Sequence, residues 1–296
     1  MNLVVGATGF LGGEICRLLA ESGRPVRAMV RSSSSEDKVA ALEGMGVEVV
    51  RGDVRERAAL DDACKGVSAV ISTISAMPFA YDPESNGIQQ VDVEGVERLI
   101  DAAKAAGAQR FVYTSISDNM NLDFPLRNAK RAVERYLRDS GLTYTILRPS
   151  YFMEGWLGPT VGFDYANGKA TIYGTGQNAI SWIAVPDVAR FAVASLDNPA
   201  AENATLELGG PDALSPDQVV SIFENIGGTK FEVTHVPEEA LTAQQQEATD
   251  PMQQSFAGLM RCYAKGDAID MSETLRAFPV ELTSVDSYAR NVLAAG

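Results

Sequence analysis

The stretch Gly6-Ala7-Thr8-Gly9-Phe10-Leu11-Gly12-Gly13, the glycine loop, decides the fold predicted for this chain. It follows the apolar run at residues 3–5 and leads into Leu11, Ile15 and Leu19, which are spaced as on one helical face. Glycines let a pyrophosphate approach the backbone, and a helix N-terminus offers N–H groups to an anion. We therefore predict a nucleotide at Gly6, Thr8, Gly9, Phe10, Leu11 and Gly12; the alternative is a turn that binds no ligand.

Short apolar runs alternate with amphipathic stretches over the first two thirds of the chain. Strands are predicted at residues 3–5, 26–30, 47–50, 69–74, 110–114 and 143–147, with a helical pattern after each of the first five. Strands that alternate with helices pair in parallel through right-handed crossovers. The pattern predicts an α/β fold with a doubly wound parallel sheet of the Rossmann type.

The alternation loosens after Pro149. Residues 151–180 are rich in glycine and aromatic residues, a helix and a short strand are expected within 183–208, and the chain is mainly helical from about 238. We expect residues 1–150 to form a nucleotide-binding domain to which 181–210 return. Residues 151–180 and 211–296 are expected to form a small C-terminal substrate-binding lobe.

Composition argues against several classes of protein. A formal net charge of −14 disfavours binding to nucleic acid or to a membrane surface. The three cysteines are far apart and there is one histidine, so neither a metal site nor a disulfide framework is expected. Buried, reduced cysteines are the simpler interpretation. Without a signal-peptide pattern or a spanning-length apolar stretch, we expect a cytoplasmic protein.

The run GATGFLGG resembles the fingerprint of extended and atypical short-chain dehydrogenase/reductases, and most of all their NmrA-like, isoflavone-reductase-like branch. Later segments carry the resemblance as well: residues 52–54 (GDV), 70–73 (VIST), 91–95 (VDVEG), 111–115 (FVYTS), 147–149 (LRP) and 186–189 (PDVA). It covers nearly the whole chain and is loose after residue 240.

The residues after the second strand indicate which nucleotide is bound. NAD-binding proteins usually place an acidic residue there, whereas this chain has Arg31, followed by Ser32 and Ser33, with Lys38 further on. A guanidinium can hold a 2′-phosphate, so NADP(H) is favoured over NAD(H); the alternative is a solvated serine-rich loop. The resemblance adds Asp53 and Val54 near the adenine, although Asp53 could equally be a helix N-cap.

The catalytic residues are predicted mainly from the resemblance. Short-chain dehydrogenases typically use a serine, a tyrosine and a lysine, and the tyrosine stands four residues before the lysine. Lys130 occupies the lysine position, but Leu126 stands where the tyrosine would be. By resemblance, Lys130 binds the nicotinamide ribose and is a candidate proton donor; the alternative is an exposed helix lysine.

Other candidates lie where strands end. Ser115, or Ser117, could polarise a substrate, and Ser72, Thr73 and Thr114 are expected near the cofactor; all could simply satisfy backbone groups. Pro149, Tyr151 and Phe152 are expected at the cofactor. Tyr151 and Phe152, with Met153 and Trp156, are also expected to line a substrate pocket; the alternative is that they are core.

Two functions remain open. The first is an NADPH-dependent reductase of a small apolar or aromatic carbonyl or enone. The second is a non-catalytic NADP(H)-binding sensor or assembly protein of NmrA type, which the absent tyrosine favours. A sugar-nucleotide epimerase is a weaker third option, because it would normally need that tyrosine. A monomer or homodimer is expected, with a small-molecule substrate, or with a protein partner if the chain is a sensor.

Overall fold

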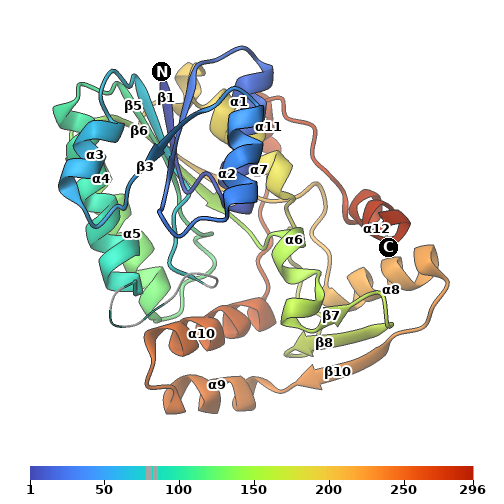
Figure 1. Ribbon diagram of the computed structural model, residues 1–296. Helices are drawn as coiled ribbons and strands as arrows, with labels where there is room; N and C mark the ends of the chain where they lie inside the picture. The colour runs from blue at the N-terminus through green and yellow to red at the C-terminus, as the bar shows by residue number, and fades with distance from the viewer. Residues whose placement is uncertain (78–81, 83, 85, 296) are drawn as a thin grey trace. The chain divides into compact units, whose positions relative to one another are not determined.

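A computed structural model describes residues 1–77, 82, 84 and 86–295 (Figure 1). The chain forms two compact units, and each is treated separately below. Unit 1 comprises Met1–Ser115, Asn128–Leu147 and Val188–Leu206. Unit 2 comprises Ile116–Arg127, Arg148–Asp187 and Glu207–Gly296.

A seven-stranded sheet organises unit 1. Its strands are β1 (Asn2–Val5), β2 (Val26–Val30), β3 (Glu48–Arg51), β4 (Ala69–Ser72), β5 (Arg110–Thr114), β6 (Thr143–Pro149) and β9 (Ala204–Leu208). They lie in the order β3-β2-β1-β4-β5-β6-β9, and every neighbouring pair from β3 to β6 is parallel. The order reverses direction between β1 and β4, which defines the doubly wound Rossmann arrangement. The predicted fold class is confirmed.

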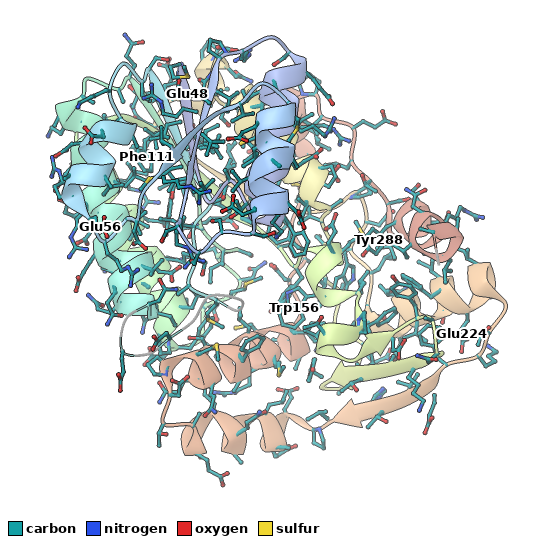
Figure 2. All side chains as sticks on the ribbon, viewed as in Figure 1. Glu48, Glu56, Phe111, Trp156, Glu224 and Tyr288 are labelled. Carbon is teal, nitrogen blue, oxygen red and sulfur yellow. The ribbon has the colours of Figure 1, made fainter. Side chains whose placement is uncertain are left out.

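Helices cover both faces of this sheet (Figure 1). The helical segments are α1 (Phe10–Glu21), α2 (Glu36–Gly44), α3 (Arg57–Ala63), the π-helix η1 (Gln89–Gly95), α4 (Val96–Ala105), α5 (Pro125–Asp139), α7 (Val185–Ala194) and η3 (Pro199–Ala201). The core is built from apolar side chains of the strands, such as Val70 and Phe111, and of the helices, such as Leu99 and Val133. Figure 2 labels Phe111, which is fully buried within this core.

Unit 2 combines a small sheet with helices. Its elements are α6 (Met153–Trp156), η2 (Pro159–Val161), β7 (Phe163–Asp164), β8 (Lys169–Tyr173), α8 (Pro216–Gly227), β10 (Glu232–Val236), α9 (Glu238–Glu247), α10 (Pro251–Lys265), α11 (Ser272–Ala277) and α12 (Val285–Ala295). The strands lie in the order β10-β8-β7, with β10 and β8 parallel. Helices α9 and α10 pack against each other, as do α8 and α12.

Two differences between the structure and the sequence prediction have a clear physical reason. Strand β8 was not predicted. It is five residues long, and only Ala170 and Ile172 are buried, in alternation with more exposed residues. Its partner β10 lies some sixty residues further along the chain and is exposed along most of its length. The helical pattern predicted after the fourth strand begins with the π-helix η1 at Gln89, which an apolar periodicity of 3.6 residues does not reveal.

Two smaller expectations can be compared with the structure. All three cysteines are buried, as expected, and burial raises the pKa of Cys16 to about 12 and that of Cys64 to about 11. Within the described residues, no helix is both long and apolar enough to cross a membrane.

Candidate functional site

The glycine loop of unit 1 connects β1 to α1 by a tight turn. Gly6 has a φ of +93°, and its carbonyl accepts a hydrogen bond of 3.0 Å from the N–H of Gly9. Gly9 is the N-cap of α1 and has no side chain with which to cap the helix. The first turn of α1 therefore keeps N–H groups for an anionic ligand.

Side chains would not fit in this turn. A Cβ on Gly6 would lie 2.6 Å from the hydroxyl oxygen of Thr73, and one on Gly12 would collide with the carbonyl of Gly6. The loop is thus held directly against its own helix and against the end of β4. Such close backbone packing is typical of glycine loops that bind a pyrophosphate.

A cationic group lies at the end of β2. The guanidinium of Arg31 makes no hydrogen bond or ion pair with any residue that the structure describes. The backbone N–H of Arg31 donates to the Ser34 hydroxyl, and Ser32 and Ser33 are exposed beside it. Lys38, on α2, donates a hydrogen bond of 3.0 Å to the carbonyl of Thr8. Of the two cations predicted to bind a 2′-phosphate, Lys38 thus contacts the glycine loop, and Arg31 directly follows β2, the strand paired with β1.

Asp53 follows β3 and is paired with Arg55. The guanidinium of Arg55 lies 2.7 Å from a carboxylate oxygen of Asp53, and hydrogen bonding to Arg55 lowers the pKa of Asp53. The positive charge of Arg31 contributes in the same direction. Glu56, not Asp53, is the N-cap of α3, so the N-cap alternative for Asp53 is wrong. Val54 is buried against Gly95, where a Cβ would lie 2.6 Å from its side chain.

Hydroxyl groups mark the ends of β4 and β5. Those of Ser72 and Thr114 are buried and lack a hydrogen-bond partner in the described part of the chain. Thr73 donates a long hydrogen bond of 3.3 Å to the carbonyl of Val5. Buried hydroxyls normally have partners, so Ser72 and Thr114 are candidates for binding a ligand.

Lys130 lies on α5 and is 4% exposed, so the alternative of an exposed helix lysine is wrong. Its ammonium donates a hydrogen bond of 3.1 Å to the carbonyl of Ile74 and forms an ion pair of 3.2 Å with Asp92. It also lies 5.3 Å from the centre of the Tyr113 ring. Ile74 directly follows Thr73, which contacts Gly6, so a short chain of contacts connects Lys130 to the glycine loop.

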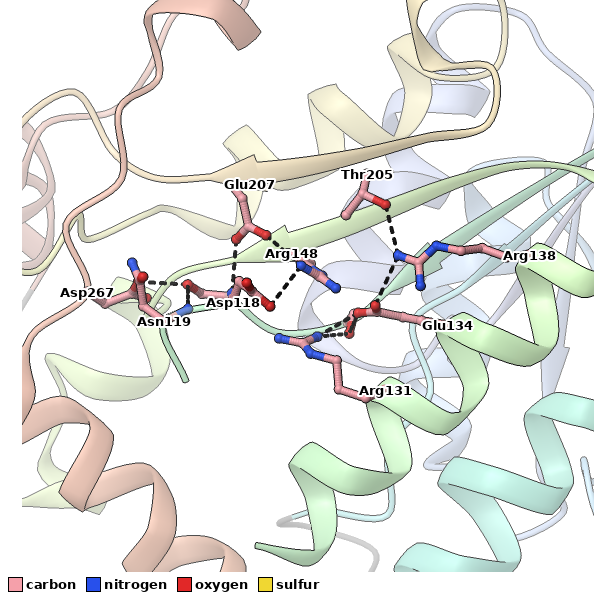
Figure 3. A network of polar contacts seen from close by, with 11 residues as sticks. Asp118, Asn119, Arg131, Glu134, Arg138, Arg148, Thr205, Glu207 and Asp267 are labelled. Atoms are coloured by element: carbon pink, nitrogen blue, oxygen red, sulfur yellow. Dashed lines mark hydrogen bonds and ion pairs between the residues drawn. The ribbon is translucent and has the colours of Figure 1, made fainter. Parts of the chain in front are cut away.

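Ser115 belongs to a buried polar network of unit 1. Its hydroxyl donates to Glu134 at 2.6 Å and accepts from Arg131 at 3.1 Å. Glu134 is also paired with Arg131 at 2.6 Å and with Arg138 at 3.3 Å, and Arg138 bonds Thr205 (Figure 3). The sequence analysis assigned no role to Glu134, although its i, i+3 and i, i+4 spacing from the two arginines favours ion pairs on one face of a helix. The catalytic role of Ser115 stays a prediction.

Aromatic side chains form the centre of unit 2. Tyr151 is 1% exposed; its hydroxyl donates to the carbonyl of Leu259, and its ring meets Trp156 edge-on at 4.8 Å. Trp156, labelled in Figure 2, is half-buried and stacks on Tyr263 at 5.6 Å. Met153 is fully buried, while Phe152 is half-buried. Tyr151 and Met153 thus contribute to the core of this unit, and the cofactor and substrate roles of Pro149 and this group stay predictions.

A second polar network lies in unit 2 and holds the loop that follows β5. The Asp267 carboxylate accepts hydrogen bonds from Ser117 at 2.7 Å and from Asn119 at 2.8 Å. Arg148 pairs with both Asp118 and Glu207 at 3.0 Å (Figure 3). Burial raises the pKa of Glu207. The hydroxyl of Ser117, the alternative to Ser115, thus donates its proton to the buried carboxylate of Asp267.

The chain is similar to known proteins over most of its length. A model of the NmrA-like family matches residues 2–289. An isoflavone reductase homolog of Zea mays is 31% identical over 98% of this chain and 97% of its own. A photosystem II assembly factor of Cyanophora paradoxa is 32% identical over 79% of this chain and 71% of its own. A crystal structure of an NADPH-dependent quinone oxidoreductase of Escherichia coli, complexed with NADPH, has a TM-score of 0.79 at 24% identity and covers 99% of both chains.

Unit 1, with its doubly wound sheet and glycine loop, places the chain among the Rossmann-type α/β proteins. The chain belongs to the NmrA-like family.

Proposed function

We propose that this protein is an NADPH-dependent reductase of a small apolar or aromatic carbonyl or enone. The observation that carries the proposal is the position of Lys130: its ammonium is bonded to Ile74, next to the residue that supports the glycine loop. A buried ammonium in that position is suited to bind the nicotinamide ribose of a dinucleotide whose pyrophosphate lies on the loop.

The residues at the strand ends fit such a cofactor. The glycine loop would bind the pyrophosphate, and Arg31 and Lys38, with Ser32 and Ser33, would bind the 2′-phosphate. Asp53 and Val54 would lie near the adenine. The partnerless hydroxyls of Ser72 and Thr114 offer hydrogen bonds that nothing else in the described residues takes up.

The reaction needs a hydride, which carries two electrons and one proton, and a second proton. When bound, NADPH would supply a hydride from C4 of its nicotinamide to the electrophilic carbon of the substrate. Lys130 would donate the proton that completes the reduction, in the absence of a tyrosine at Leu126. We propose Ser115 as the group that polarises the substrate; its hydroxyl proton, which is donated to Glu134, would turn to the substrate oxygen. We propose Tyr151, Phe152, Met153 and Trp156 as apolar residues that bind the substrate. Relatives named as an isoflavone reductase homolog and an NAD(P)H azoreductase support this class of reaction.

A non-catalytic role is the second candidate. Leu126 is buried where the usual tyrosine would be, and its backbone N–H donates to Ser255. Several relatives are named as photosystem II assembly factors, at 28–32% identity. In this case NADP(H) binding would regulate association with a protein partner.

The test compares nucleotide binding in three proteins by calorimetry: the wild type, Arg31→Ala and Arg24→Ala. Arg24 is the matched control, because it precedes β2 whereas Arg31 follows it, and it pairs with Asp197. We expect NADPH to bind the wild type and Arg24→Ala at least tenfold more tightly than NADH, about 1.4 kcal/mol. Arg31→Ala should remove that preference.

Turnover then separates the two candidates. Loss of NADPH absorbance with a small quinone or enone, abolished in Lys130→Met at unchanged thermal stability, supports the reductase. A large difference between the affinities for NADP⁺ and NADPH, without turnover, supports the regulatory role. Preference for NADH, or no binding of any nucleotide, would contradict both.

A further inference from the structure

Asp92 is a fully buried carboxylate that the sequence did not single out. It lies in η1, and both of its oxygens face other segments of unit 1. One oxygen accepts a hydrogen bond of 2.9 Å from the backbone N–H of Ala76, and the other lies 3.2 Å from the ammonium of Lys130. A buried carboxylate is costly unless it is paired, so its position is maintained by these two contacts.

The local backbone brings Asp92 to this place. The π-helical turn of η1 contains an extra residue relative to an α-helix, and such turns occur frequently at functional sites. At its end, Gly95 packs against Val54, where a Cβ would lie 2.6 Å from the valine side chain. The absence of a side chain at Gly95 thus lets η1 lie close to the segment after β3.

The ammonium of Lys130 is confined from two sides. The Ile74 carbonyl takes one hydrogen bond, and the Asp92 carboxylate faces the ammonium as an ion pair. An ammonium has three N–H donors, and one of them is bonded to Ile74. The facing Asp92 oxygen, at 3.2 Å, accepts no hydrogen bond from a described residue; its charge attracts the ammonium and thereby limits the directions of the other two N–H groups. Asp92 also binds Ala76, two residues after Ile74, and thereby ties the segment that receives Lys130 to the same carboxylate.

We propose that Asp92 is a positioning residue: it holds the ammonium of Lys130 in the orientation in which a further N–H binds the nicotinamide ribose. This inference rests on the proposed function and deepens it. Asp92 acts through Lys130 and makes no contact of its own with the cofactor. Its removal therefore weakens only ligands that carry the nicotinamide ribose.

The experiment uses two probes, NADP⁺ and adenosine 2′,5′-bisphosphate, which retains the 2′-phosphate and lacks the nicotinamide ribose. Both are titrated calorimetrically into the wild type, Asp92→Asn, Lys130→Met and the double variant. The asparagine has nearly the same shape and keeps an acceptor for the Ala76 N–H. Thermal unfolding of each variant verifies that it is folded.

We expect Asp92→Asn to weaken NADP⁺ about tenfold and to leave the bisphosphate within about twofold. In the Lys130→Met background, Asp92→Asn should have no further effect, because the residue through which it acts is gone. An effect that persists in that background, an equal loss for both probes, or no loss at all overturns the positioning role. Failure of the wild type to bind the bisphosphate instead overturns the proposed function, and this inference with it.

Discussion

The carboxylate of Glu134 lies 2.6 Å from the guanidinium of Arg131, and both side chains are buried on α5. The same carboxylate accepts a hydrogen bond of 2.6 Å from the hydroxyl of Ser115. The pair therefore connects α5 to the end of β5, next to Lys130. A buried ion pair of this kind adds little stability relative to apolar side chains, but the loss of one partner leaves an uncompensated charge.

Glu134→Ala should consequently lower the free energy of unfolding by about 3–5 kcal/mol, because Arg131 stays buried without its main partner. Urea unfolding followed by circular dichroism measures this. Asp61→Ala is the control: it removes an exposed i, i+4 pair with Arg57 in the same unit and should leave the urea midpoint close to that of the wild type. Similar losses in both variants would contradict the buried role of Glu134.

Gly12→Ala should disrupt the glycine loop, because the added methyl collides with the carbonyl of Gly6. We expect a loss of about 1–3 kcal/mol in stability and a weakening of NADPH binding by more than about tenfold. Gly44→Ala, at the end of α2, meets no atom within 4 Å and should be neutral or stabilise by up to about 1 kcal/mol. Unfolding curves and calorimetry on both variants test this; unchanged NADPH binding in Gly12→Ala would be evidence against the loop as a binding site.

Ser215→Ala should destabilise unit 2 through the N-terminus of α8. Ser215 and Gln218 form a reciprocal capping box, with hydrogen bonds of 3.3 Å and 2.8 Å. Loss of the serine hydroxyl should cost about 1 kcal/mol. Ser221→Ala, on the exposed side of the same helix, should change stability by less than about 0.5 kcal/mol. Thermal unfolding compares the two variants, and equal effects would exclude a special role for the cap.

Stability should depend on pH through Asp53. The bond with Arg55 lowers the pKa of Asp53 in the folded protein below its unfolded value of 3.8. A lowered carboxylate pKa contributes stability that is present above the unfolded pKa and is lost as pH falls through the folded pKa. The difference in unfolding free energy between the wild type and Asp53→Asn should be constant above about pH 5 and shrink below 3.8. Urea unfolding across this range measures the difference; its growth on acidification would contradict the pairing.

The order of strands and helices in unit 1 was determined by the sequence itself. Apolar periodicity reports which side of a segment is buried, and it depends only on neighbouring residues. The glycine loop could also be predicted from the sequence, because Gly6 and Gly12 stand where a Cβ would collide with neighbouring atoms. The family could be predicted from the glycine loop and from the later segments that resemble those of the family and stand in the same order.

Only the tertiary structure decided how the charged and polar groups are paired. Lys130 is buried because Ile74 and Asp92, far away in the sequence, supply its partners. Ser115 donates a hydrogen bond to Glu134, nineteen residues further along the chain. The hydroxyl of Tyr151 can be buried in the core because the Leu259 carbonyl of α10 accepts a hydrogen bond from it. Strands β8 and β10 pair across a long separation without a strong apolar pattern. Local patterns report burial of a face, whereas the partner of a buried charge depends on which distant segments the fold brings together.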